Sequence, residues 1–156
     1  MIERVFVYGA GMVSTGELLI HLLGLVRALD PSVLSGEAAA GVVRDLAVIE
    51  KAAATGRMFA ALRVAQTDAW RGQGHASAAD WLAAQAGITV REAAAQLGTA
   101  RKAEQLPKTK AAMRDGDLSP DQAEAVTGAA AADPGAEDAL LDAARSDTTS
   151  QLRDKA

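Results

Sequence analysis

The sequence predicts an all-α protein: a long N-terminal amphipathic helix, paired as a helical hairpin, followed by a compact bundle of short helices that contains a helix-turn-helix-like unit. About half of the 156 residues are apolar (49%), but only 3% are aromatic. Much of the apolar content is alanine, which favours helix and buries little area, so closely packed helices around a thin core are expected. Apolar residues also recur every three or four positions, and capping residues precede several of these runs.

Residues 1–14 are predicted to be a tail or an extension ahead of the helices. Gly9, Gly11 and Gly16 form a G-x-G-x-x-x-x-G pattern, which is longer than the dinucleotide-binding fingerprint. No strand–helix–strand unit follows, so no nucleotide cofactor is expected. On a second interpretation, Met12 is the natural start and the preceding residues are an upstream extension.

Residues 15–74 are predicted to form a helical hairpin or arm. From Thr15 onward, leucine and valine residues fall on one broad helical face. Pro31 closes this helix, because proline disfavours helix at the residue before it. Ser35 then caps a long helix that is expected to run to about Trp70.

The long helix carries a near-heptad seam of small and apolar residues. Its members are Val42, Leu46, Ile49, Ala53, Gly56, Ala60 and Val64. Such a seam is typical of helices that pair with another helix, so a homodimer through Val42–Val64 is predicted as one assembly. A helical protein-interaction or homo-oligomerisation module without nucleic-acid binding is therefore an alternative function.

Residues 75–156 are predicted to form the helical bundle. Ser77 starts a short helix that Gly87 ends, and Trp81 on this helix is expected to pack against Trp70 in the core. Later boundaries are expected at Pro107, Gly116, the Ser119–Gln122 capping box, Asp133-Pro134 and a further capping box beginning at Thr148.

Within the bundle, residues 88–106 have the spacing of a helix-turn-helix. Thr89 and Glu92 form a capping box, and the helix that they start is predicted to stop at Gly98 in a left-handed turn. Thr99 is then predicted to cap a second helix with the sequence TARKAEQL.

Positive charge is concentrated around this segment. The net charge of −4 divides into 0 for residues 1–74, +2 for 75–115 and −6 for 116–156, so only the middle part suits a phosphate backbone. The candidate DNA-binding residues are Arg91, Thr99, Arg101, Lys102, Gln105, Lys108, Lys110 and Arg114. Ordinary solvated faces explain the same basic charges, and they explain acidic residues such as Glu137 and Asp138 at a helix start.

Two family resemblances bear on this segment. The order I-T-x-x-E-A-A-x-x-L-G-T-A-R, followed by L-P and G-x-L-S, resembles the helix-turn-helix of ParB-type partition proteins. From Trp70 to Leu152 the chain resembles the actinobacterial family called domain of unknown function 222, on the motifs W-R-G, S-A-A-D-W-L-A, G-I-T-V-R-E-A, L-G-T-A-R-K-A-E-Q-L-P, G-D-L-S-P-D-Q-A and D-A-A-R. In that family the domain usually precedes an HNH endonuclease, so the resemblance implies a DNA-binding or DNA-targeting role.

The chain departs from the fused family pattern at the residues that would carry chemistry. It has no cysteine, and its two histidines, His21 and His75, lack ligand spacing, so no metal site and no catalytic residue are expected. The family's usual His-Ala after the Leu-Ser turn is Gln122-Ala123 here, so a role for that histidine is not carried over. The resemblance implies a non-catalytic targeting domain, and it leaves open whether an HNH module follows Ala156.

The composition also predicts a soluble, cytoplasmic protein with no membrane partner. The longest strongly apolar run, Leu18 to Leu29, contains His21 and Arg27 and is shorter than the roughly 20 residues that cross a bilayer as a helix. The N-terminus also lacks the basic segment and the small-residue cleavage site of a signal peptide.

Overall fold

The computed structural model describes residues 13–146 and 151–152, and the regular structure in those ranges is entirely helical. The α-helices are α1 (Thr15–Ala28), α2 (Gly36–Gln66), α3 (Ala78–Ala86), α4 (Val90–Ala103), α5 (Pro107–Arg114), α6 (Pro120–Ala132) and α7 (Glu137–Ser146). Short 3-10 helices are η1 (Pro31–Val33), η2 (Arg71–Gln73) and η3 (Pro134–Ala136). The all-α prediction is confirmed for this part of the chain. The predictions at Gly9, at Gly11 and at the start of a capping box at Thr148 lie outside the described residues.

The contacts divide the chain into two units, residues 1–43 and residues 44–156. The division falls inside α2, whose first turns belong to the first unit and whose remainder belongs to the second. It differs from the boundary near residue 74 that the sequence suggests, because the second half of α2 supplies side chains to the core of the bundle.

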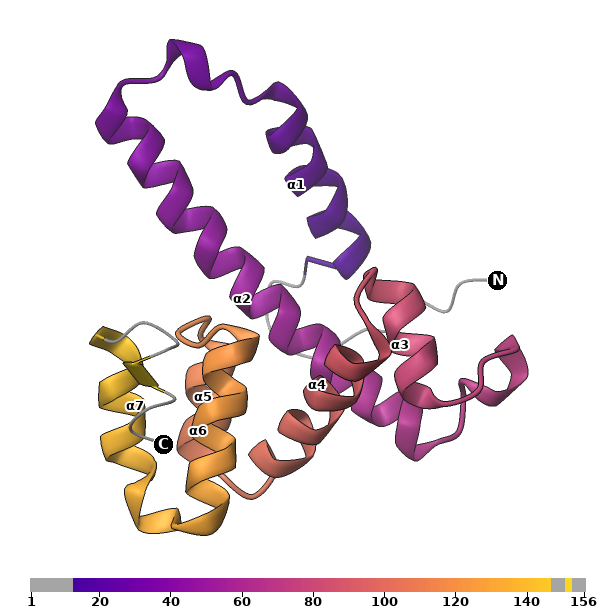
Figure 1. Ribbon diagram of the computed structural model, residues 1–156. Coiled ribbons are helices and arrows are strands. Elements are labelled where there is room, and N and C mark those ends of the chain that lie inside the picture. Colours follow the sequence, from indigo (N-terminus) through magenta and orange to yellow (C-terminus); the bar gives the residue numbers. More distant parts are fainter. Residues whose placement is uncertain (1–12, 147–150, 153–156) are drawn as a thin grey trace. The chain divides into compact units, whose positions relative to one another are not determined.

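The first unit contains α1, η1 and the first turns of α2 (Figure 1). Ser14 and Glu17 close a capping box at the start of α1, in which each accepts the backbone N–H of the other, at 3.2 and 2.7 Å respectively. Asp30 accepts a backbone N–H with its side chain and so begins η1. The predicted helix start at Thr15 and the predicted end before Pro31 are confirmed.

Helix α2 begins after Ser35, whose hydroxyl accepts a backbone N–H at 3.2 Å, and it runs through Gly56 without interruption. The predicted start is therefore confirmed. The helix ends at Gln66, short of the predicted Trp70, because Asp68 has a left-handed φ of 55° that is incompatible with a continuing helix.

The face of α2 that is buried differs from the predicted seam. The buried residues are Ala54, Thr55, Met58, Ala61 and Leu62. The seam members Ile49, Ala53 and Gly56 are exposed. Alanine is abundant on both sides of the helix, so the spacing of apolar residues alone does not identify the face that packs. A second copy on the exposed seam stays a prediction.

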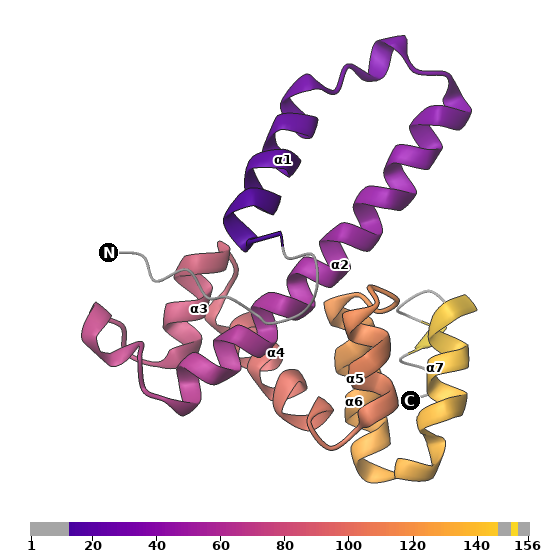
Figure 2. The ribbon, with the colours of Figure 1, turned by 180° about the vertical axis from the view of Figure 1, so that it is seen from behind.

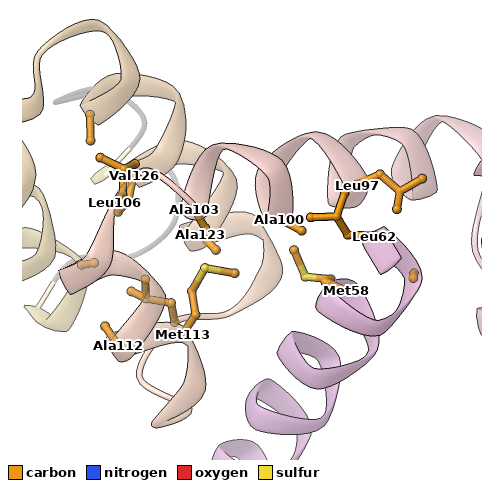
Figure 3. Packing of buried hydrophobic residues seen from close by; sticks show 14 of the residues in the cluster. Met58, Leu62, Leu97, Ala100, Ala103, Leu106, Ala112, Met113, Ala123 and Val126 are labelled. Atoms are coloured by element: carbon orange, nitrogen blue, oxygen red, sulfur yellow. The ribbon is translucent and has the colours of Figure 1, made fainter. Parts of the chain in front are cut away.

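The second unit holds the hydrophobic core. Met58 and Leu62 of α2 face Ala100 and Leu97 of α4 (Figure 3), and α5, α6 and α7 pack side by side (Figures 1 and 2). Ten of the 21 buried apolar residues in the described ranges are alanines. Small side chains let the helix axes approach closely, as the composition predicts.

The predicted caps of three short helices are confirmed. Ser77 accepts a backbone N–H at the start of α3, and Thr89 and Ser119 each close a capping box at the starts of α4 and α6. Gly87 and Gly116 follow α3 and α5 with φ values of 66° and 77°. Glycine adopts this left-handed conformation without steric cost, so both helices end where the sequence predicts.

The predicted turn at Gly98 is wrong, and so is the predicted helix start at Thr99, because both residues lie inside the continuous helix α4. The residues that α4 buries on its inner face include Ala93, Leu97, Ala100 and Ala103. These positions follow one another at spacings of four and three, so they form one stripe. Burial of this uninterrupted stripe outweighs the roughly 1 kcal/mol by which glycine disfavours a helix interior.

The two tryptophans have different surroundings. Trp81 packs against the core, and its Nε1 donates a hydrogen bond to Oε1 of Gln73 at 2.9 Å. The ring of Trp70 instead has the guanidinium carbon of Arg71 4.9 Å from its centroid. The expected core position is confirmed for Trp81, and its pairing with Trp70 stays a prediction.

Glu137 is buried, with 8% of its surface exposed, although the sequence predicts a solvated position. Its Oε1 accepts hydrogen bonds from the backbone N–H of Thr109 at 2.7 Å and from the Thr109 hydroxyl at 2.8 Å. Both donors belong to the first turn of α5, where backbone N–H groups have no partner within the helix. The carboxylate of α7 therefore caps α5.

Candidate nucleic-acid interface

The strongest candidate site is the side of α4 that points away from the core, which we call the outer face. It consists of Arg91, Ala94, Gly98, Arg101 and Lys102, and these residues lie opposite the buried stripe on a helix of 3.6 residues per turn. The cations at its two ends are separated by about 15 Å along the axis at 1.5 Å per residue. Alanine and glycine lie between them, so a bulky ligand can approach the helix closely.

Arg101 and Lys102 are exposed, and neither has an ion pair or a side-chain hydrogen bond within the ranges that the structure describes. They occupy the last turn of α4, where positive charge also interacts favourably with the helix dipole. Gln105, just beyond the helix, is exposed as well. A cation without a carboxylate partner binds a phosphate without first giving up an ion pair. These three residues are therefore the best placed of the predicted DNA ligands.

Arg91, at the other end of the outer face, lines a groove of about 520 Å³ between α4 and α6. Glu92, Asp121 and Glu124 line the same groove, so three of its four ionisable residues are acidic. Carboxylates repel phosphate, and the groove itself does not suit nucleic acid. Arg91 can contact DNA only from the exposed edge of this groove.

Lys108 is paired with α7. Its Nζ donates to Oδ1 and Oδ2 of Asp138 at 2.7 and 2.6 Å. These hydrogen bonds and the negative charge of Asp138 raise the pKa of the Lys108 ammonium above its usual value. Both side chains are exposed, but Lys108 must exchange a carboxylate for a phosphate in order to contact DNA.

Lys110 and Arg114 lie over the ring of Phe59 from α2. The Nζ of Lys110 and the Cζ of Arg114 are 5.4 and 5.6 Å from the ring centroid, which is cation–π distance. Lys110 also donates to Oε1 of Glu104 at 2.7 Å. The spacing of Lys110 and Arg114 by four residues indicates a shared helix face, but no signal in the sequence points to Phe59 beneath them.

Thr99 is removed from the candidate interface because it is buried, with 3% of its surface exposed. The sequence predicts Thr99 at the start of a second helix, where its hydroxyl would be free to bond a phosphate. Only a small part of Thr99 reaches the groove between α4 and α6, whose carboxylates do not suit a phosphate. The predicted set therefore reduces to Arg101, Lys102 and Gln105, with Arg91 at the far end of the same face.

Among the residues that the structure describes, no group of three or more His, Asp or Glu side chains is arranged to hold a metal ion. None of the described helices is long and apolar enough to cross a membrane. Comparisons of the chain with protein-family models, with curated proteins and with solved structures found no match.

Proposed function

We propose that this chain is a non-catalytic DNA-binding or DNA-targeting domain whose contact surface is the outer face of α4. The observation that carries the proposal is the exposed pair Arg101 and Lys102, which have no carboxylate partner in the described part of the chain and lie beside exposed Gln105. Arginine and lysine neutralise phosphates, and glutamine reaches base edges. Ala94 and Gly98 on the same face leave room for a nucleic-acid backbone.

In this proposal, α3 and α4 with the turn between them form the helix-turn-helix unit. The turn from Gly87 to Thr89 has the length and the left-handed glycine of such connections. The second helix of the unit is the one that lies against DNA in this class of protein. That helix is α4, which replaces the shorter helix that the sequence predicts after Gly98.

The resemblance to the family called domain of unknown function 222 supports the same role. Its domain usually precedes an HNH endonuclease, and this sequence has no cysteine and only two histidines. The proposed role is therefore to place an endonuclease or another effector on DNA, without cutting the DNA itself.

The proposed binding is electrostatic and modest in affinity. The chain carries a net charge of −4, and the outer face contributes few unpaired cations. A dissociation constant in the range of non-specific complexes, about 10⁻⁴ to 10⁻⁶ M at physiological salt, is expected. Binding should tighten steeply as the salt concentration falls.

Titration of a labelled mixed-sequence duplex at low salt, followed by fluorescence anisotropy, tests the proposal. Replacing Arg101 and Lys102 together by alanine should weaken binding roughly tenfold, because two phosphate contacts are lost. A matched control replaces Arg71 and Arg145 by alanine, which removes the same charge from two exposed ion pairs on other helices. The control should bind like the wild type.

Two results would contradict the proposal. Equal weakening of both double variants would mean that only net charge matters, and unchanged binding by the Arg101→Ala, Lys102→Ala variant would remove α4 as the DNA contact. Circular dichroism shows whether each variant keeps its helix content, since loss of cations at the end of α4 also weakens the helix-dipole interaction.

A helical interaction module without nucleic-acid binding is the second candidate function. The exposed side chains of the α2 seam, Ile49 among them, favour it. Self-association of a wild-type chain that binds no duplex at low salt would support this candidate over the first.

A further inference from the structure

Gly98 is a glycine that the fold of α4 does not require. It lies in the interior of the helix and does not have a left-handed φ. Apart from its chain neighbours and the backbone of α4, no atom lies within 4 Å of a Cβ built at this position. Because alanine favours a helix interior over glycine, an alanine here would fit and would stabilise α4. The space above Gly98 is open.

This open space lies between the two cations of the proposed site. Arg101 and Lys102 follow Gly98 by three and four residues, so they lie about 60° and about 40° from it on opposite sides of the helix axis. Long side chains on a helix lean toward its N-terminus, over the residues three and four positions earlier. Both cations therefore extend along the space above Gly98. We call the space bounded by Gly98, Arg101 and Lys102 the notch.

The surroundings of the notch suit an extended anion. Ala94, one turn before Gly98, continues the surface with another small side chain. Glu92 is the acidic residue of α4, and it lies about 120° from Gly98 around the axis. It lines the groove against α6 instead. The notch therefore combines two cations with a missing side chain, and no carboxylate of α4 faces it.

We infer that the notch holds the sugar–phosphate backbone of a nucleic-acid strand against Gly98, with phosphates bound by Arg101 and Lys102 on either side. The inference rests on the proposed function and adds which part of the nucleic acid touches the helix. Glycine is used where a backbone approaches a ligand closely. Gly98 is thus a positioning residue, because a side chain there would hold the strand away from both cations.

Gly56 on α2 provides a matched control. It also lies inside a helix and is exposed, and no atom lies within 4 Å of a Cβ built there by the same criterion. The residues three and four positions later are Phe59 and Ala60, so no pair of cations flanks it. Substitution at Gly56 therefore changes helix propensity alone.

Fluorescence anisotropy with a labelled mixed-sequence duplex at low salt tests the inference. Gly98→Leu should weaken binding roughly tenfold, as much as loss of the two cations, since the strand no longer reaches either of them. Gly98→Ala should weaken it less, and Gly56→Ala and Gly56→Leu should bind like the wild type. In urea denaturation, both alanine variants should raise the midpoint, because alanine favours helix. A gain in stability together with a loss of affinity at Gly98 is not expected of a purely structural residue.

Three results would overturn the inference. Gly98→Leu that binds like the wild type, while the Arg101→Ala, Lys102→Ala variant is weakened, would remove the notch but keep the proposed function. A Gly98→Ala variant with a lowered urea midpoint would mean that Gly98 serves the fold. Inorganic phosphate that displaces more duplex than chloride does at equal ionic strength would place a small anion in the notch instead of a strand. Unchanged binding by the Arg101→Ala, Lys102→Ala variant would instead remove the proposed function itself.

Discussion

Gly116 has two structural roles: it ends α5, and its lack of a side chain lets α2 pack closely against it. Its φ is 77°, and a Cβ added there would lie 2.9 Å from the carbonyl oxygen of Val48 and 3.0 Å from Cγ1 of the same residue on α2. Gly87 has a similar φ of 66° but no atom within 4 Å of an added Cβ. A side chain at Gly87 would therefore cause backbone strain alone, whereas a side chain at Gly116 would cause both backbone strain and a steric clash.

Alanine substitution at these two positions should have unequal effects on the free energy of unfolding. Gly87→Ala should cost about 1 kcal/mol, the strain of a left-handed residue with a side chain. Gly116→Ala should cost a further 1–3 kcal/mol or so, because the backbone of α2 must move to admit the methyl group. Urea denaturation measures both, and equal losses would show that α2 does not pack against Gly116 as described.

The stability that Glu92 contributes at the start of α4 depends on pH. Its pKa is lowered by the hydrogen bond from the backbone N–H of Thr89 and then by the bond from the Thr89 hydroxyl. Because the pKa of the folded state lies below that of the unfolded state, this contribution to stability is complete above the ordinary value of 4.5. It is lost as the pH falls through the lowered pKa.

Glu92→Gln keeps a capping-box side chain but removes the titration. The wild type should therefore lose its advantage in urea midpoint over this variant as the pH is lowered from neutral to below 4.5. Ser119→Ala is the control, since its box partner Gln122 does not titrate, and the cost of this substitution should be the same at both pH values. A difference between wild type and Glu92→Gln that does not change with pH would contradict the assignment.

At the scale of the elements, α5 is attached to α7 through two neighbouring acidic residues in different surroundings. Glu137 is buried and accepts two hydrogen bonds from Thr109, whereas Asp138 pairs with Lys108 in solvent. Buried hydrogen bonds to a charged group contribute more than exposed ion pairs, because water competes less and an abandoned donor is costly.

Glu137→Ala should therefore lower the free energy of unfolding by about 2–3 kcal/mol, since the backbone N–H of Thr109 is left buried without an acceptor. Asp138→Ala should have a clearly smaller effect. Chemical denaturation of the two variants under the same conditions gives the comparison. Equal effects, or a larger one for Asp138→Ala, would mean that Glu137 does not cap α5.

The helix boundaries that the sequence predicts correctly are those set by local bonds. Thr89 and Ser119 each bond a side chain three residues later, so both partners are visible in a short stretch of sequence. Gly98 shows the opposite. A glycine at this position indicates a turn when only the neighbouring sequence is considered, but burial of the stripe around Leu97 keeps the helix continuous. That burial depends on contacts with α2 and α6, which the residues around Gly98 alone cannot predict.

At the scale of the whole molecule, the sequence predicts the residue types of the candidate site but not their partners. Lys108 is paired with Asp138, 30 residues away, and Lys110 with Phe59 and Glu104. Arg101 and Lys102 have no such partner in the residues described. The packing of α5 against α7 and α2 shows which of the predicted cations already have a partner within the chain. Composition and spacing do not contain this information, so the sequence alone could not narrow the predicted DNA ligands.

The chain as a whole is acidic, so its proposed affinity for DNA depends on where the cations without an ion pair lie. The net charge is −4, and the surface around the groove between α4 and α6 adds three carboxylates. In the proposal, a phosphate backbone is bound at the last turn of α4, away from these carboxylates. The proposal therefore predicts that replacing Arg101 and Lys102 removes most of the salt-dependent binding.

The salt dependence of duplex binding tests this central claim most directly. A plot of the logarithm of the binding constant against the logarithm of the salt concentration has a slope of about −0.9 for each phosphate that the protein neutralises. Replacing Arg101 and Lys102 by alanine should make the slope shallower by about two, while replacing Arg71 and Arg145 should leave it unchanged. Identical slopes for the wild type and the Arg101→Ala, Lys102→Ala variant would contradict a DNA contact at the outer face of α4.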